Sequence, residues 1–497
     1  MTTAERSLRD RAELEQRLLA RRARRNPGIP AAGRRPGVNR FPASPVQQLM
    51  WEFHHECPGE STWVTLGGVR LFGPLDLALL QRALDALVER HESLRTVFRA
   101  GEGGTVEQVV LDRGHRLTLP VLEVSAEQAR TAAAAAIDQP FDLVNGPLAR
   151  LHVLRLAPQE HHLMLVLHHI VSDGHSMEVF IQELSALYLS LAAEVPSPLP
   201  PLTVQPADVA AWQRARWDDN TRRRVTGYWQ RRLADAEPLR LPTDVQPGPE
   251  PSSAGLTCQL PVDEETIDRL RRLGKEHQAT LFMVTLAAFH LLFARYSGQR
   301  GAMVSTPYSY RDRPETYAPI GAFINYLMLR PDLSGDPAFH TVLEQVRDAT
   351  LLDFEHHQLP LDELIDALGM DPVEGRRTLM RVLFTEESDP EIPLAPDGEL
   401  RSEMIADPPW HHALRDLTLR VTAGEDGTHV IVTYRADAFT PQRAADIAAD
   451  YRDLLRLVAA DPGVRVLGAH AALPLRVPVA DAPAAATAAS EPALEEL

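Results

Sequence analysis

The proline-rich segment VPSPLPPL, at residues 195–202, divides the sequence into two parts. Proline lacks a backbone N–H and clashes with the preceding helical turn, so a helix does not continue through this segment. On both sides of it, short apolar stretches with the period of a strand alternate with longer stretches of helical period. We therefore predict a linker between two mixed α/β lobes, one formed by residues 38–195 and the other by residues 196–475.

Individual strands and helices are clearest in the first part. Alternating polar and apolar residues predict strands, and an apolar face that repeats with helical period predicts a helix. By these criteria we expect strands at residues 64–73, 148–157 and 161–170, and helices at residues 75–91 and 176–194. A short turn separates the last two strands, so they should form a hairpin.

The composition of the 497-residue chain is that of a folded protein, with 44% hydrophobic and 24% charged residues. Its net charge of −17 argues against nucleic acid or an anionic membrane surface as a partner. The longest apolar stretch, residues 281–294, is shorter than the roughly 20 residues that span a membrane, and it contains His290. We therefore expect a buried core helix there and no membrane segment.

Neither the cysteines nor the histidines have the spacing of metal ligands. Cys57 and Cys258 are far apart, which also disfavours a disulfide framework and fits a reducing cytoplasm. Adjacent histidines in a strand face opposite sides of the sheet, so a pair does not bind one metal ion from one face. No metal site is therefore expected at the adjacent pairs His54-His55, His161-His162, His168-His169, His356-His357 and His411-His412.

The two ends of the chain differ from its body. Residues 1–40 contain eleven arginines and four acidic residues, and residues 7–25 have the pattern of a short helix that Pro27 stops. This basic arm, residues 1–37, is either a docking helix or a solvated one. The tail, residues 476–497, is rich in alanine and proline and is expected to be disordered.

The strongest candidate for chemistry is the junction LMLVLHHIVSDGHSM, at residues 163–177. Here an apolar strand ends in His168 and His169, a short loop holds Asp173 and Gly174, and a helix follows. A strand end is rigid, and an imidazole with a pKa of about 6.5 can take a proton from a nucleophile near neutral pH. Gly174 would allow the loop a backbone conformation that is costly for other residues. Two structural interpretations stay open: a histidine packed in the core, and an aspartate that only caps the helix.

Within this junction, HHIVSDG (168–174) matches HHxxxDG, the signature of the condensation domains of nonribosomal peptide synthetases and of other chloramphenicol-acetyltransferase-like acyltransferases. Further segments resemble motifs that condensation domains carry in this order: FPASPVQQLMW (41–51), RHESLRTVF (90–98), IGAFINYLMLR (320–330), HHQLPLDELI (356–365) and DLTLRV (416–421). The resemblance covers about residues 38–475, which is nearly everything except the arm and the tail.

The resemblance implies an α/β (α+β) fold of two chloramphenicol-acetyltransferase-like lobes in a V-shaped pseudo-dimer with a central tunnel. It implies a stand-alone acyltransferase of antibiotic or other natural-product biosynthesis, which takes an acyl or aminoacyl group from the phosphopantetheine thioester of a donor carrier protein. The acceptor would be the amine or hydroxyl of an acceptor carrier protein or of a free small molecule, giving an amide or an ester. Such an enzyme needs no cofactor of its own, and a cytoplasmic monomer is expected. The basic arm would suit the acidic surfaces of carrier proteins.

The family's site residues carry over by motif. His169 corresponds to the essential histidine, which orients or deprotonates the acceptor or stabilises the tetrahedral intermediate, and His168 precedes it in the motif. Asp173 would be structural and held by a buried salt bridge. Its expected partner is Arg311, which lies shortly before the IGxF motif, and Arg95 is the second candidate. No substrate-binding residue is indicated.

Four further positions bear on substrate choice. Gly174 would let the backbone pass close to the reacting thioester. His175, Tyr326 and His357 stand where the family often has Trp, Thr and Gln. An unusual donor or acceptor preference is therefore expected.

Other proteins of the same fold are the alternatives. Acyl-CoA-dependent transferases share the histidine motif, but this chain has no DFGWG segment. Epimerisation domains share the motif as well, whereas heterocyclisation domains replace it with DxxxxD. A non-enzymatic alternative is a condensation-like domain that recruits a tailoring oxygenase, and the intact HHIVSDG segment argues against it.

Overall fold

The computed structural model describes residues 28–56, 63–245, 252–388, 400–405, 412–424, 427–467 and 473–477. The helix expected at residues 7–25 and the tail from residue 478 lie outside these ranges, as do Cys57 and His411. What the sequence predicts for them stays a prediction.

The helices and strands follow the order that the sequence predicts. Before the linker they are β1 (Asn39–Pro42), α2 (Pro45–Glu56), β2 (Val64–Phe72), α3 (Leu77–Arg90), the 3-10 helix η1 (Glu92–Arg95), β3 (Thr96–Ala100), η2 (Glu102–Gly104), β4 (Val106–Val110), β5 (Val121–Glu123), α4 (Ala126–Asp138), β6 (Ala149–Ala157), β7 (Glu160–His168), η3 (His169–Val171) and α5 (Gly174–Ala192). After it come α6 (Pro206–Arg216), α7 (Asp219–Leu233), β8 (Gly255–Val262), α8 (Glu264–Glu276), α9 (Leu281–Ser297), β9 (Val304–Ser309), η4 (Pro314–Thr316), β10 (Ile324–Leu329), α10 (Phe339–Glu355), α11 (Leu361–Ala367), α12 (Pro372–Leu379), β11 (Val382–Ser388), β12 (Arg401–Met404), β13 (Leu417–Gly424), β14 (Gly427–Arg435) and α13 (Pro441–Ala460). The strands and helices predicted in the first part are confirmed as β2, α3, β6, β7 and α5.

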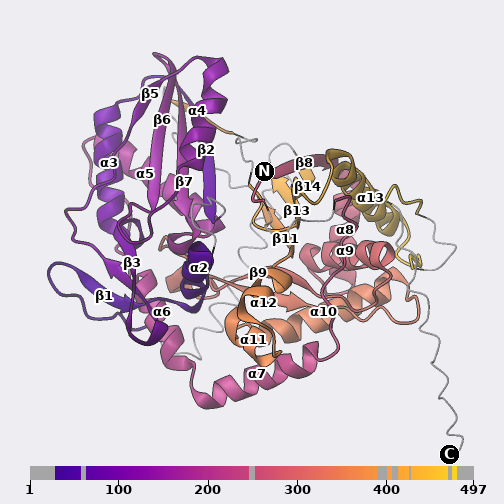
Figure 1. Cartoon of the computed structure of the whole chain (residues 1–497). Helices are drawn as coiled ribbons and strands as arrows, with labels where there is room; N and C mark the ends of the chain where they lie inside the picture. Colours follow the sequence, from indigo (N-terminus) through magenta and orange to yellow (C-terminus); the bar gives the residue numbers. More distant parts are fainter. Residues whose placement is uncertain are drawn as a thin grey trace, which may run out of the picture.

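The first lobe is built on a five-stranded sheet in the order β12-β2-β7-β6-β5 (Figure 1). β7 pairs antiparallel with β2, from Val64 opposite His168 to Phe72 opposite Glu160, and antiparallel with β6, which confirms the hairpin. Alternate leucines of β7 pack against α3 and α5 on one face, whereas Met164 packs with α4 on the other. Burial of both faces fixes the register of β7 and hence the point at which it ends.

The second lobe is built on a six-stranded mixed sheet in the order β10-β9-β11-β13-β14-β8. Most residues of α9 are buried, including His290, which confirms the core helix predicted at residues 281–294. α8, α10 and α13 pack around it. Among the described residues, no single helix is long and apolar enough to cross a membrane. Only α8 and α9 taken together, bent by 103°, reach that length and composition.

The lobes stand side by side and converge towards α6 and α7 at the base of the view (Figure 1). Residues 195–205 form no helix or strand, which confirms the linker. In addition, β12 returns from the second half of the chain and pairs with β2 in the first lobe, with Met404 opposite Val69. The lobe boundary at residue 195 stays a prediction, and this strand crosses it. A small sheet of order β1-β4-β3 has no counterpart among the predicted elements.

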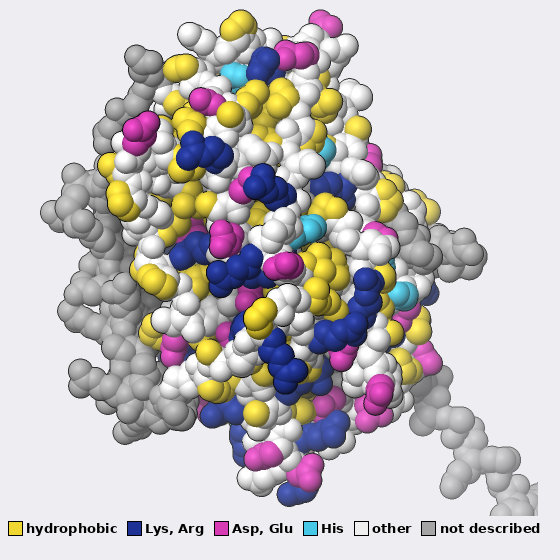
Figure 2. Space-filling view, turned by 90° about the vertical axis from the view of Figure 1, so that its left-hand side faces the viewer, with side chains coloured by type: hydrophobic (Ala, Val, Ile, Leu, Met, Phe, Trp, Pro, Cys, Tyr) yellow, Lys and Arg dark blue, Asp and Glu magenta, His cyan; other side chains and the backbone are white. Residues whose placement is uncertain are grey.

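The surface seen in Figure 2 carries charges of both signs. Arginines and carboxylates lie interspersed over this face, with hydrophobic side chains between them. The negative charge that the sequence has in excess is therefore mixed with arginines on this side of the molecule.

Candidate active site

The junction of β7 and α5 holds His169 in one tautomer. β7 ends at His168, and His169 begins the turn η3 that leads to α5. The Nδ1 atom of His169 lies 3.2 Å from the carbonyl oxygen of Ser172 and 3.4 Å from the Thr65 hydroxyl. A carbonyl oxygen only accepts, so Nδ1 carries the ring proton. Nε2 therefore keeps its lone pair, as a general base requires.

The surroundings also keep His169 neutral. Burial lowers the pKa of His169 below its ordinary value of 6.5. The hydrogen bond to Ser172 and the charge of Asp173 raise this pKa, and the charge of Arg415 lowers it, so that the net shift is downward. At neutral pH the imidazole is thus the free base.

His168 faces the other side of the sheet. Its Nδ1 accepts a hydrogen bond from the backbone N–H of Ile170 at 3.0 Å, and its ring meets the rings of Phe141 and His54 edge-on. Burial holds the pKa of His168 well below 6.5. These contacts favour a supporting role in the turn rather than the catalytic role predicted for this residue.

The ion pair predicted between Asp173 and Arg311 is present and links the two lobes. Both side chains are buried, with exposed fractions of 3% and 5%. Nη2 and Nε of Arg311 donate to the two carboxylate oxygens of Asp173 at 2.8 and 3.0 Å. Burial alone would raise the pKa of Asp173, but the Arg311 guanidinium outweighs this and holds the pKa below its ordinary value of 3.8.

Asp173 also caps α5, so the helix-cap interpretation describes a second task of the same carboxylate. Its Oδ1 accepts hydrogen bonds from the backbone N–H of Ser176 at 2.9 Å and from the Ser176 hydroxyl at 2.7 Å. Its Oδ2 accepts from the backbone N–H of Phe323 at 3.2 Å. The carboxylate is therefore engaged in fixing the loop to the second lobe.

Arg95, the second candidate partner of Asp173, is not its partner. Nη1 of Arg95 donates to the carbonyl of Leu111, and Nη2 lies 3.9 Å from the Glu92 carboxylate. The expectation for Arg95 was wrong because the 3-10 turn η1 directs this side chain to residues of its own lobe.

Two other motifs hold the junction from outside. Gln47, in the SPVQ segment, donates from Nε2 to the carbonyl of Ile170 at 3.1 Å. His91, in the RHES segment, accepts at Nδ1 from the backbone N–H of Ile320 at 3.2 Å, and its Nε2 donates to Glu183 on α5 at 2.6 Å. Segments far apart in the sequence thus converge on both sides of the histidine loop.

Gly174 does not have the unusual conformation expected of it. It is the first residue of α5 and is not among the glycines with positive φ. A Cβ built at this position would meet no atom within 4 Å, so the space beside it is open. The expectation was wrong because the extended backbone of Asp173, with φ −132° and ψ −177°, makes the entry into the helix.

Gly321, by contrast, leaves no room for a methyl group. An ideal Cβ there would lie 2.7 Å from Cγ of Pro206 and 2.7 Å from the ring of Phe323, over which Arg311 stacks at 4.5 Å. We predict that Gly321→Ala lowers the free energy of unfolding by about 1–3 kcal/mol, because Pro206 and Phe323 must both shift. Urea denaturation measures the change. Gly174→Ala is the matched control with a change within about 0.5 kcal/mol, and equal stability of the two variants would contradict the contact.

Trp63, Tyr326 and Arg415 surround His169, and sequence reasoning identifies neither Trp63 nor Arg415. The Trp63 ring meets the rings of His169 and Tyr326 edge-on, with centres 6.1 and 6.3 Å apart. The guanidinium carbon of Arg415 lies 5.2 Å from the centre of the Tyr326 ring and 5.9 Å from that of Trp63. Trp63 directly precedes β2, and Arg415 lies just before β13. Their places at the ends of strands that border the site are the signal that could have found them.

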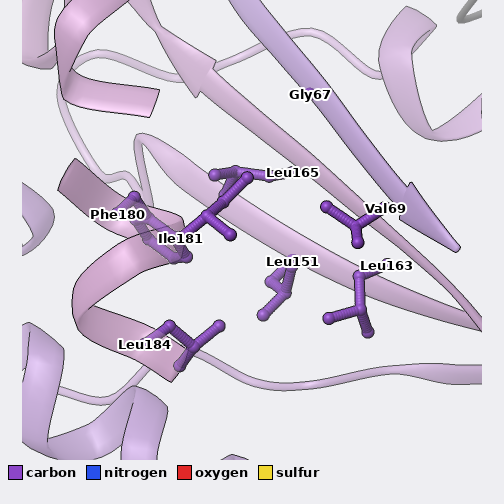
Figure 3. Close-up of a pocket in the computed structure, with 8 residues that line it drawn as sticks. All are labelled: Gly67, Val69, Leu151, Leu163, Leu165, Phe180, Ile181 and Leu184. Atoms are coloured by element: carbon purple, nitrogen blue, oxygen red, sulfur yellow. The ribbon is translucent and has the colours of Figure 1, made fainter. Parts of the chain in front are cut away.

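A small cavity lies between the first-lobe sheet and α5 (Figure 3). Its volume is about 10 Å³, and it is lined by Gly67, Val69, Leu151, Leu163, Leu165, Phe180, Ile181 and Leu184. This volume holds about one water molecule, and the apolar lining offers that water no partner. The cavity is therefore a space in the core packing and is far too small for an acyl group.

Sequence comparison connects these features with known proteins. The condensation-domain family matches residues 38–468. A linear gramicidin synthase of Brevibacillus parabrevis is 35% identical over 439 residues, which cover 86% of this chain and 6% of that synthase. Chondramide synthase cmdD of Chondromyces crocatus is 35% identical over 439 residues, which cover 87% of this chain and 11% of that synthase. The chain thus spans only a small part of the length of these relatives.

Solved structures share the fold. The X-domain from teicoplanin biosynthesis superposes with a TM-score of 0.78 and 27% identity, over 88% of this chain and 98% of the X-domain. The first condensation domain of the CDA synthetase superposes with a TM-score of 0.74 and 22% identity, over 88% of this chain and 99% of that domain. The predicted fold of two chloramphenicol-acetyltransferase-like lobes is therefore confirmed. With the motifs gathered around His169 and the family match across both lobes, the chain belongs to the condensation-domain family of nonribosomal peptide biosynthesis.

Proposed function

We propose that the chain is an acyltransferase that moves an acyl or aminoacyl group from the phosphopantetheine thioester of a carrier protein to an amine or a hydroxyl. The observation that carries this proposal is the state of His169, whose Nδ1 is held by the Ser172 carbonyl and whose Nε2 keeps its lone pair. The ion pair of Asp173 with Arg311 fixes the loop that bears this base between the lobes.

In the proposed reaction, Nε2 of His169 accepts the proton of the acceptor N–H or O–H while the nucleophile attacks the thioester carbonyl carbon. The tetrahedral intermediate then collapses with cleavage of the C–S bond. The proton passes from the imidazolium to the leaving phosphopantetheine thiolate, so His169 returns to its neutral form. A C–N or C–O bond has replaced the C–S bond, and alignment of the two substrates at His169 lowers much of the barrier.

The proposed partners are a donor carrier protein and either an acceptor carrier protein or a free small-molecule nucleophile. The phosphopantetheine arrives with the carrier as part of the substrate, and no further cofactor is proposed. The reaction has one base and one pair of substrates per chain, so a monomer suffices.

The test is mass spectrometry of an acyl-loaded carrier protein mixed with a panel of amines, alcohols and acceptor-loaded carriers. Wild type should move the acyl group to at least one acceptor, and His169→Asn should not. The acceptor that gains the acyl mass decides between amide and ester. Transfer by a verified His169→Asn protein at the wild-type rate would refute the proposal.

The lowered pKa of His169 predicts the pH dependence of transfer. Because the free base is the active form and its pKa lies below 6.5, kcat/KM should stay level from about pH 8 to about pH 6.5 and fall at lower pH. A hydroxyl acceptor is used, since an amine would itself be protonated in this range. A limb centred above pH 6.5 would contradict the assignment.

Acid also weakens the fold, which this measurement has to control. Burial lowers the pKa of His168 and brings that of His290 to about 3. These histidines stay neutral in the folded chain and gain protons when unfolded, so stability is lost as the pH falls below about 6.5. Unfolding is therefore measured at each pH alongside the rate.

A recruiting domain is the second candidate, favoured by one solved complex. The X-domain in complex with OxyB from teicoplanin biosynthesis superposes on this chain with a TM-score of 0.77 and 27% identity. Under this alternative the chain would bind a tailoring enzyme and transfer nothing. A wild-type protein that binds a tailoring oxygenase but transfers no acyl group to any member of the panel would favour it.

A further inference from the structure

Two hydrogen-bond donors beside His169 lack partners within the described part of the chain. Among the described residues, the Arg415 guanidinium makes no hydrogen bond or ion pair, and its Nε and Nη2 are buried. The indole N–H of Trp63 is likewise buried without a partner, in a side chain that is 4% exposed. Unpaired buried donors cost free energy, so this cluster favours a ligand that supplies acceptors.

The charge of Arg415 is uncompensated as well. Three buried arginines are each paired with a carboxylate: Arg311 with Asp173, Arg376 with Asp362 and Arg435 with Asp416. Arg415 instead lies against the faces of Tyr326 and Trp63, which hold a cation in place without neutralising it. The third guanidinium nitrogen, Nη1, is not among the enclosed atoms, so a ligand can reach it.

We propose that Arg415, supported by Trp63, binds a carboxylate carried by a substrate whose reacting group lies at His169. A carboxylate brings two acceptor oxygens in a plane that matches the guanidinium, together with the missing negative charge. The inference rests on the proposed function, because the carboxylate belongs to the acyl donor or to the acceptor. A free amino acid would carry it close to the nucleophilic nitrogen, and a dicarboxylic acyl group would carry it further along the chain.

The place of Arg415 in the molecule agrees with this task. Its charge is close enough to lower the pKa of His169, and Trp63 contacts both side chains. Trp63 comes from the first lobe and Arg415 from the second. The carboxylate would therefore be held between the lobes, one aromatic ring away from the base.

A binding experiment tests the site without turnover. Ligand-observed NMR compares succinate with succinamide, which has a similar shape and no charge, on wild type, Arg415→Gln and the control Arg456→Gln. Arg456 lies on α13, pairs with Asp263 at 3.0 Å and loses the same charge. Succinate should bind wild type and Arg456→Gln about tenfold or more tightly than Arg415→Gln, and succinamide should not distinguish the proteins. Equal affinity of succinate for wild type and Arg415→Gln would overturn the inference, and retained binding by Arg415→Lys shows that the variants fold.

Transfer assays then identify which substrate carries the carboxylate. One arm offers succinyl and succinamoyl donors to an uncharged acceptor, and the other offers alanine and alaninamide to an uncharged donor. In one arm, wild type should prefer the carboxylate by about tenfold relative to Arg415→Gln, and this ratio cancels the different basicities of the two amines. If succinate binding depends on Arg415 but wild type transfers nothing, the proposed function fails and the site stands. If transfer proceeds and neither arm depends on Arg415, the inference fails and the proposed function stands.

Discussion

Asp173→Ala is expected to lower the free energy of unfolding by about 3–5 kcal/mol, because it leaves the buried Arg311 guanidinium without its counter-ion. Nη1 of Arg311 would keep the carbonyls of Thr316 and Pro319, but Nε and Nη2 would lose both carboxylate oxygens. The same change removes the cap of α5. Urea denaturation near neutral pH measures the loss, and acyl transfer should fall with it because the His169 loop is released.

The exposed ion pair of Arg40 with Glu107 provides the control. Its side chains are 62% and 36% exposed, so Glu107→Ala should cost less than about 1 kcal/mol. The double variant Asp173→Leu with Arg311→Met should be less destabilised than either single variant, since it leaves no buried charge unpaired. If Asp173→Ala unfolds at the same urea concentration as wild type, the ion pair does not stabilise the chain.

The pH dependence of this ion pair has a definite sign. The pKa of Asp173 is held below 3.8 in the folded chain, so its contribution is fully present above that value. The contribution is lost as the pH falls through the lower pKa of the folded state, and the difference between wild type and Asp173→Ala should shrink accordingly.

His169→Asn is expected to lower the rate of acyl transfer by about 10²- to 10⁴-fold with little change in stability. The asparagine amide can still donate to the Ser172 carbonyl, as Nδ1 does, but it offers no basic nitrogen in place of Nε2. Single-turnover transfer from an acyl-loaded carrier measures the rate, and urea denaturation checks the fold.

His340→Asn is the matched control, because Nδ1 of His340 also bonds to a backbone carbonyl, that of Pro462 at 3.0 Å. It lies on α10 of the second lobe and should leave the rate within about twofold. An equal loss in both variants, or no loss in His169→Asn, would remove His169 from the mechanism.

The strand, loop and helix around His169 could be predicted because each step has a local cause. The apolar run that becomes β7 ends where polar residues begin, and Asp173 is a good first residue for a helix cap. The long-range pairing with Arg311 was reachable only through the resemblance to a known motif order. Local sequence carries no information about which distant cation meets the carboxylate.

Other features could not be read from the sequence for physical reasons. β12 is a short segment, RSEM, and its strand conformation comes from pairing with β2 rather than from its own pattern. Trp63 and Arg415 are far apart in the sequence and meet only because the lobes pack against each other. Arg95 failed as a partner because a one-turn 3-10 helix sets the direction of its side chain, and motif order says nothing of that direction.

The return of β12 to the first lobe has a consequence for how lobes can be exchanged between related enzymes. While the chain is synthesised, the hydrogen-bonding edge of β2 stays open until residues 401–404 have been made, and an open edge invites pairing with other chains. Residues 38–195 are therefore not a transplantable module by themselves. A chimaera that takes its first lobe from one parent must take residues 401–404 from the same parent, since this strand completes the sheet to which the histidine loop is attached.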